Sequence, residues 1–144
     1  MTTYNIFYNS NKEIIWSTTG QINDGIKTAQ ADLGLSHVAL DLADDNQPDS
    51  NYYVNSDATA LVQKTAWDFT FSTTTPSIDE VINVTGLPTG TKVYMNGTLQ
   101  GAMTDTTLTL TVQEPSTYII KFEKLHYQKH NGTQVIVKRY GEWI

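Results

Sequence analysis

Short runs of alternating polar and apolar residues recur after Asp68, and they constrain the fold more than any other feature of this sequence. The clearest run, residues 107–112, reads TLTLTV and places leucine and valine on one face and threonine on the other. Turn-forming residues separate the runs at roughly eight-to-twelve-residue spacing, which is typical of a β-sandwich. Strands are therefore expected at residues 69–73, 81–85, 92–95, 107–112, 117–124 and 134–140.

Two Asn-Gly dipeptides are the strongest turn signals. Each predicts a two-residue hairpin turn with both residues at positive φ, because type I′ turns favour Asn-Gly. The first belongs to residues 87–101, LPTGTKVYMNGTLQG, where one apolar-alternating arm runs into Asn96-Gly97 and a second short arm follows. The tip of this hairpin is either a binding site or only a corner of the scaffold. The turn positions expected to be structural are Pro88, Gly90, Asn96, Gly97, Pro115, Asn131 and Gly132.

The first half predicts a meander of short strands. Residues 4–18 form one expected hairpin around the turn NSNK, residues 37–42 a strand, and residues 52–64 a second hairpin. Residues 24–34 are either one or two helical turns, with Asp24 as N-cap and Gly34 as the stop, or a loop. The few large apolar residues predict a small core that needs a neighbour. We expect an N-terminal hairpin-rich module at 1–67, with Trp67 in its core, and a C-terminal β-sandwich at 68–144.

Composition excludes several classes of protein. The 144 residues carry a net charge of −6, and 22 of them are threonine, which favours strands. Residues 1–67 hold eight acids and three bases, so no nucleic-acid partner is expected. No apolar run approaches the roughly 20 residues that span a bilayer, and no secretory signal opens the sequence. We therefore expect no membrane partner and synthesis in a cytoplasm. There are no cysteines, hence no disulfides or thiolate metal sites.

The sequence offers little catalytic chemistry. His126 and His130 are four apart, but on a strand and its turn they would share no face, and an HExxH motif is absent. The acidic stretch with Asp41, Asp44, Asp45 and Asp49 is either a weak calcium site or a solvated loop, and it lacks the spacing of an EF-hand. No nucleophile elbow or phosphate-binding loop is visible. We expect no enzyme activity, no metal and no cofactor.

Aromatic residues raise the alternative of a carbohydrate-binding module. Indole and phenol rings stack on sugars, but they also fill cores that are poor in Leu and Phe. Both interpretations stay open for the candidates, which are Trp16, Tyr52, Tyr53, Trp67 and Trp143.

Residues 86–127 contain a family pattern. "GLPTGTKVYMNGTLQG" followed by "TLTLTVQEPSTYIIKFEKLHY" resembles the PEGA β-sandwich repeats and the immunoglobulin-like C-terminal modules of minor structural proteins of tailed bacteriophages. The opening "YNIFYNSNKEIIWSTTG" and the later stretch "NYYVNSDATALVQK" resemble the paired hairpins that begin such phage proteins. The proline-rich join of that family is replaced here by Lys64-Thr65-Ala66-Trp67. The resemblance implies an immunoglobulin-like second module and a virion component present in several copies.

Contact with neighbouring proteins is expected at both ends of the chain. The C-terminal GEWI and a free edge formed by the first strand would anchor a neighbouring subunit. The last hairpin is rich in basic residues, which suits contact with an acidic N-terminal half. The expected interface residues are Tyr4, Phe7, Lys138, Arg139, Trp143 and Ile144.

The function expected from the sequence is that of a non-enzymatic phage virion protein. It would be associated with the tail or tail fibre, with copies of itself and other virion proteins as partners. Two alternatives remain: a capsid decoration protein, and a carbohydrate-binding module with weak glycan contact for host attachment.

Overall fold

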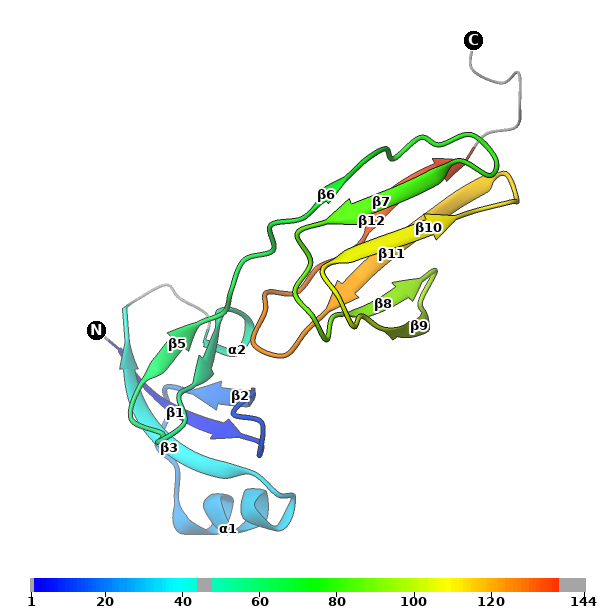
Figure 1. The fold of residues 1–144 in the computed structure, drawn as a ribbon. Coiled ribbons are helices and arrows are strands. Elements are labelled where there is room, and N and C mark those ends of the chain that lie inside the picture. The colour runs from blue at the N-terminus through cyan, green and yellow to red at the C-terminus, as the bar shows by residue number, and fades with distance from the viewer. Residues whose placement is uncertain (1, 44–47, 138–144) are drawn as a thin grey trace. The chain divides into compact units, whose positions relative to one another are not determined.

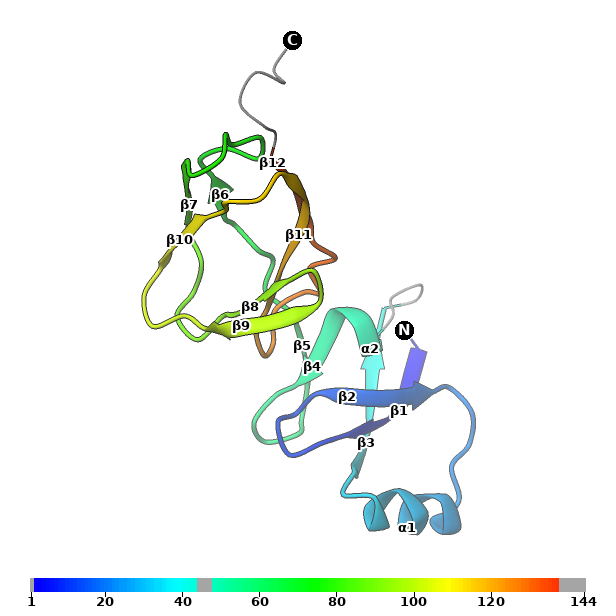
Figure 2. The same cartoon turned by 90° about the vertical axis from the view of Figure 1, so that its right-hand side faces the viewer.

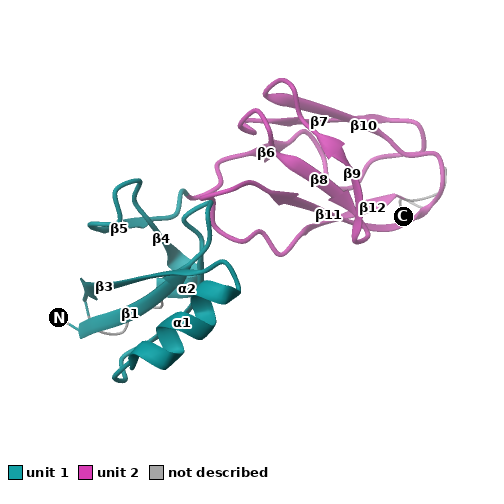
Figure 3. Ribbon diagram, turned by 90° about the horizontal axis from the view of Figure 1, so that it is seen from below, with its two compact units in different colours: residues 1–65 teal, residues 66–144 magenta. Residues whose placement is uncertain are grey.

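The computed structural model describes residues 2–43 and 48–137. Nearly half of these residues lie in antiparallel strands, accompanied by two short helices (Figure 1). The chain divides into two compact units, Met1–Thr65 and Ala66–Ile144 (Figure 3). No helix in the described part of the chain is long and apolar enough to cross a membrane.

A three-stranded sheet organises the first unit. It contains β1 (Thr2–Tyr8), β2 (Ile14–Thr18) and β3 (Ser36–Leu42) in the order β2-β1-β3. The predicted hairpin of residues 4–18 is present as β1 and β2, and Lys12 takes φ 67° in its turn. Because β3 pairs with the other side of β1, β1 is the central strand.

Two helices and a second hairpin complete the first unit. α1 (Asp24–Asp32) lies in the stretch that was open between helix and loop. Its N-cap is Asn23, one residue before the predicted Asp24, because the Asn23 side chain accepts a hydrogen bond from the Ile26 N–H at 2.8 Å. α2 (Pro48–Asn51) precedes the hairpin of β4 (Tyr52–Val54) and β5 (Leu61–Gln63), which lies within the predicted range 52–64.

The first unit buries a small core on one face of its sheet. Ile6, Tyr8, Ile14 and Val54 are buried together, and partly buried side chains from β3, β4 and β5 surround them. On the other face, Phe7 is fully buried and stacks on Trp16, with ring centroids 4.3 Å apart. Alternate residues of β1 thus serve opposite faces, as a strand requires.

The described part of the second unit, residues 66–137, contains seven strands. They are β6 (Thr70–Phe71), β7 (Val81–Thr85), β8 (Lys92–Met95), β9 (Thr98–Ala102), β10 (Thr107–Thr111), β11 (Ser116–Glu123) and β12 (Thr133–Val137). They form two antiparallel sheets, ordered β10-β7-β6 and β12-β11-β8-β9.

Both sheets contribute to one apolar core in this unit. Ile82 and Val84 come from the first sheet, and Ile120, Phe122 and Val135 from the second. The alternation that marked these strands in the sequence is therefore an alternation between core and solvent.

Trp67 belongs to the second unit, not to the core of the first as expected. Its ring lies 4.8 Å from that of Tyr127 and 6.2 Å from that of Phe122, and its indole N–H donates to the Gln128 carbonyl at 2.6 Å. The units divide between Thr65 and Ala66, whereas the predicted modules were 1–67 and 68–144. The large ring finds more apolar surface in the second core.

Candidate functional site

The second unit has one open side, formed by consecutive strands. β9 ends one sheet and β10 ends the other, and the short segment 103–106 connects them (Figure 2). No described strand pairs with the outer edge of either. All five residues of β9 are exposed, and β10 alternates between exposed threonines and half-buried leucines.

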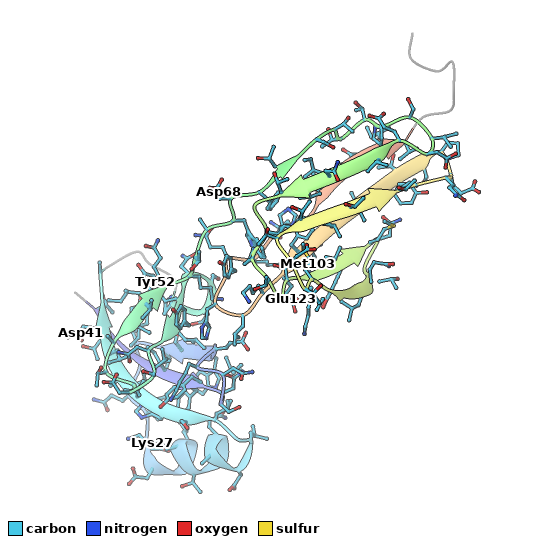
Figure 4. The ribbon with its side chains drawn as sticks, viewed as in Figure 1. Lys27, Asp41, Tyr52, Asp68, Met103 and Glu123 are labelled. Carbon is cyan, nitrogen blue, oxygen red and sulfur yellow. The ribbon has the colours of Figure 1, made fainter. Side chains whose placement is uncertain are left out.

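A groove of about 300 Å³ lies between these two strands. Its apolar wall contains Val93 and Met103 together with Leu108 and Leu110 of β10. Met103, labelled in Figure 4, is buried in the shared core, so the groove reaches the core itself. Among the described lining residues, Asp105 is the one with an ionisable side chain. Such a surface suits an uncharged strand or apolar side chains better than a charged ligand.

The opposite edge of the four-stranded sheet is partly covered within the unit. The Ile136 N–H of β12 donates to the Thr74 carbonyl at 2.9 Å, so the segment after β6 lies along β12. The open side is therefore a specific feature of β9 and β10.

The Asn96-Gly97 tip is tied to the scaffold. Asn96 has φ 50° and Gly97 φ 83°, as the type I′ prediction requires. The Ile119 N–H of β11 donates to the Asn96 side-chain carbonyl at 2.9 Å, and the Asn96 N–H donates to the Ile119 carbonyl at 2.9 Å. The geometry of this tip is that of a corner that holds two strands together.

The second Asn-Gly prediction is wrong. β11 and β12 are joined by the nine residues 124–132, and Asn131-Gly132 lies at the end of this connection, not in a two-residue turn. Of the two residues only Gly132 has positive φ, at 117°. A Cβ at Gly132 would lie 2.4 Å from Ile119 Cγ2, so any other residue there would have to displace the Ile119 side chain.

The other predicted turn positions take part in local turns. Gly90 has φ 82°, and the Thr91 hydroxyl donates to the Pro88 carbonyl at 2.6 Å, which satisfies a fully buried threonine. Pro115 precedes β11, and in the same turn the Tyr118 hydroxyl donates to the Glu114 carbonyl at 3.0 Å.

The predicted free edge at the first strand is wrong. β1 pairs with β2 on one side and β3 on the other, so its backbone is not available to a neighbour's sheet. Phe7 is fully buried, and Tyr4 packs against the core of the first unit. The remaining predicted interface residues, Lys138, Arg139, Trp143 and Ile144, lie outside the described residues.

Two acidic residues of the candidate calcium loop bond to hydroxyls. The Thr3 hydroxyl donates to Asp41, and the Ser17 hydroxyl donates to Asp49. Asp44 and Asp45 lie outside the described residues, and within residues 2–43 and 48–137 no three His, Cys, Asp or Glu side chains gather as metal ligands would. The solvated loop stays the prediction for this stretch, with a weak calcium site as its alternative.

The His130 ring is held in place by two hydrogen bonds and by an aromatic contact within the second unit. Its Nδ1 accepts a hydrogen bond from the Phe122 N–H at 3.1 Å, so the ring proton lies on Nε2, which donates to the Thr133 hydroxyl at 3.2 Å. The ring stacks on Phe122 with centroids 5.4 Å apart. Burial and then the Lys121 charge lower the pKa of His130. Burial and then Lys27 likewise lower the pKa of His37, whose Nε2 lies 3.0 Å from the Asn5 side-chain oxygen.

Three of the aromatic candidates for sugar binding, Trp16, Tyr52 and Trp67, make contacts within their own units. Trp16 stacks on Phe7, and its indole N–H donates to Gln30 at 2.9 Å. Trp67 packs in the second core as described above. Tyr52 packs partly buried against the first core, and Trp143 lies outside the described residues. Glycan binding stays a prediction that these contacts do not favour.

The open groove was not predicted from the sequence. The one sequence feature that pointed to the groove was the uncharged strand at residues 107–111. That this strand lies at the edge of a sheet depends on its pairing with residues far away in the chain. No family model matches the sequence, and no curated protein matches it at a significant level.

Proposed function

We propose that the second unit is an immunoglobulin-like β-sandwich. Its two sheets, β6-β7-β10 and β9-β8-β11-β12, correspond in chain order to strands A-B-E and C′-C-F-G of that fold. The hydrogen bond from the Tyr118 hydroxyl to the Glu114 carbonyl supports this assignment. A tyrosine near the start of strand F that bonds back to the chain a few residues upstream is a hallmark of such sandwiches.

The chain as a whole is, in this proposal, a non-enzymatic structural protein of a tailed-bacteriophage particle, associated with the tail or tail fibre. It assembles in multiple copies through protein–protein contacts. The observation that carries the assembly role is the open side of the second unit, where two edge strands without a charged residue flank a groove that reaches the core. Exposed edges without charge are rare in monomeric proteins because they attract other strands.

The small core of the first unit supports the same role. Its main cluster has four buried residues, Ile6, Tyr8, Ile14 and Val54, and α1 buries none of its residues. A unit with so little buried apolar surface gains stability from a neighbour. The phage assignment itself rests on the resemblance of the hairpins and of residues 86–127 to phage structural proteins.

Immunogold electron microscopy tests the location. An antibody raised against the recombinant chain would be applied to phage particles purified from a lysate of infected host cells. Gold at the tail supports the proposal, whereas gold distributed over the head favours the capsid decoration alternative. A chain that is expressed in the infected cell but absent from purified particles contradicts a virion role.

A further inference from the structure

β10 is the edge best suited to pair with another strand. Its register against β7 is continuous over all five residues, and it contains no charge and no proline. β9, the neighbouring edge, is interrupted by a bulge between Val93 and Tyr94 on its partner strand, and its Gly101 has φ 147°. Bulges and charges are the usual protection of edges, and β10 has neither.

The ladder shows which backbone groups of β10 point outward. The Ser72 N–H donates to the Asn83 carbonyl, so the backbone of Asn83 faces β6. Its neighbours Ile82 and Val84 consequently face β10, opposite Leu110 and Leu108.

The backbone groups of Thr107, Thr109 and Thr111 are therefore directed away from β7. One observation agrees with this directly: the Thr107 N–H donates to the Asp105 side chain at 3.0 Å and not to β7. The outer edge thus presents backbone donors and acceptors at every second residue over the length of the strand.

We infer that the occupant of this edge is β10 of a second copy of the same chain. The sequence TLTLT reads the same in both directions, so an antiparallel pair centred on Thr109 places like residues opposite each other. Thr109 then faces Thr109 of the second copy, and Thr107 faces Thr111. All three are outward-directed residues. The central Thr109 pair can exchange both backbone hydrogen bonds, and each outer pair can do so once the Thr107 N–H gives up its bond to Asp105.

Both faces of the joined sheet match in this register. Threonine lies opposite threonine on the outer face, an arrangement that is favourable across strands. On the inner face Leu108 of each copy lies opposite Leu110 of the other, and these leucines line the groove that leads to the core. A two-fold axis perpendicular to the sheet keeps the leucines of both copies on one side, where they cover each other.

The flanking charges do not oppose this pairing. Extending the register places Asp105 opposite Gln113 and Thr104 opposite Glu114 of the second copy, so no carboxylate faces another. A register shifted by two residues keeps only two of the three threonine pairings within β10, around a central leucine pair. Sequence symmetry therefore selects the register centred on Thr109.

The contact is small, and this decides its strength. A single five-residue strand pair with four leucines is at the low end of specific interfaces, which begin near roughly 1,000 Å² of buried surface. We expect a dissociation constant on the order of 0.1–1 mM in free solution. Such a contact forms readily where copies are already held together by other contacts. This inference therefore rests on the assembly role proposed above, and it identifies β10 as one of the surfaces through which the copies meet.

Charge-swapped variants of the full chain test the pairing. Sedimentation equilibrium from about 10 μM to about 1 mM would be measured for the parent, for Thr109→Lys and for Thr109→Glu, with melting curves to show that each is folded. Like charges opposed across the two-fold axis weaken association by about tenfold or more in either variant alone. An equimolar mixture of the two variants restores it. Thr117→Lys, on an exposed threonine of β11, is the matched control and leaves dimerisation unchanged.

Two results overturn the inference in different ways. If the parent dimerises and Thr109→Lys dimerises equally well, the copies associate through another surface and the assembly role stands. If the parent is monomeric at about 1 mM, a second copy is not the occupant of β10. In that case the virion role is still decided by the gold-labelled particles.

Discussion

Asn96 and Ile119 are joined by two hydrogen bonds of 2.9 Å, one through the backbone N–H of Asn96 and one through its side-chain oxygen. The side chain at the exposed tip of the β8–β9 hairpin thereby extends the ladder of β11 by one acceptor. Asn96 makes this contact at φ 50°, a conformation that Asn tolerates better than most residues.

Asn96→Ala should destabilise the second unit by about 1–2 kcal/mol, since it leaves the Ile119 N–H without its acceptor and places alanine at φ 50°. Chemical denaturation of the full chain measures the change. Asn131→Ala is the matched control: it is an exposed Asn before Gly that does not have positive φ, and its replacement should alter the free energy of unfolding by less than about 0.5 kcal/mol. Equal losses for the two variants would contradict the bonding role of Asn96.

Gly86→Ala should be more destabilising than Gly97→Ala, although the two glycines have nearly the same φ, 84° and 83°. A Cβ at Gly86 would lie 2.4 Å from the Asp68 carbonyl oxygen, whereas a Cβ at Gly97 meets nothing within 4 Å. The strain of positive φ, about 1 kcal/mol, is common to both, so the difference in unfolding free energy isolates the steric clash. We expect that difference to exceed about 1 kcal/mol. Similar melting temperatures for the two variants would mean that the segment at Asp68 moves aside freely.

Trp67 should stabilise the second unit although it lies beside the unit boundary. Trp67→Ala removes a partly buried ring and the hydrogen bond to the Gln128 carbonyl, and should lower the free energy of unfolding by about 2 kcal/mol. Trp67→Phe keeps a ring and loses only the donor, so a smaller loss is expected. The same logic predicts that a chain starting at residue 66 melts at a higher temperature than one starting at residue 69. If both chains melt together, Trp67 contributes nothing to this core.

The local part of the fold was predictable from the sequence. β7 and β8 have the bounds expected from alternation, because Ile82, Val84 and Val93 point into the core at every second position. The turn at Asn96-Gly97 followed from the φ values that only a few residues accept. In each case the residues that determine the structure are neighbours in the chain.

Features that depend on distant residues were not predictable in this way. β1 shows the same alternation whether it is an edge or the centre of a sheet, and only its pairing with β3 makes it central. Asn131-Gly132 has the letters of a hairpin turn, but the side chain of Ile119 packs against Gly132 and the turn lies elsewhere. The groove beside β10 likewise exists because residue 107 pairs with residue 85 and nothing described pairs beyond it.

His130 should make the second unit less stable as the pH falls below neutrality. In the folded chain burial and then Lys121 lower its pKa from the ordinary 6.5, and Nδ1 must stay unprotonated to accept the Phe122 N–H. As the pH falls through 6.5 the unfolded chain takes up a proton that the folded chain does not, which favours unfolding. The contribution of the neutral His130 ring to the free energy of unfolding is therefore complete above pH 6.5 and declines below it. It stops declining once the pH falls below the lowered pKa that His130 has in the folded chain.

The Phe122 amide resonance should report this protonation directly, because its N–H donates to His130 Nδ1. His37 acts in the same direction within the first unit, so the contribution of His130 is taken as the difference between the parent and His130→Gln. That variant should melt lower at pH 7 but lose less stability between pH 7 and 5.5. Lys121→Met should raise the pKa of His130 only in part, because burial is the larger cause. A melting temperature with the same pH slope in the parent and in His130→Gln would show that this ring titrates alike in the folded and unfolded chain.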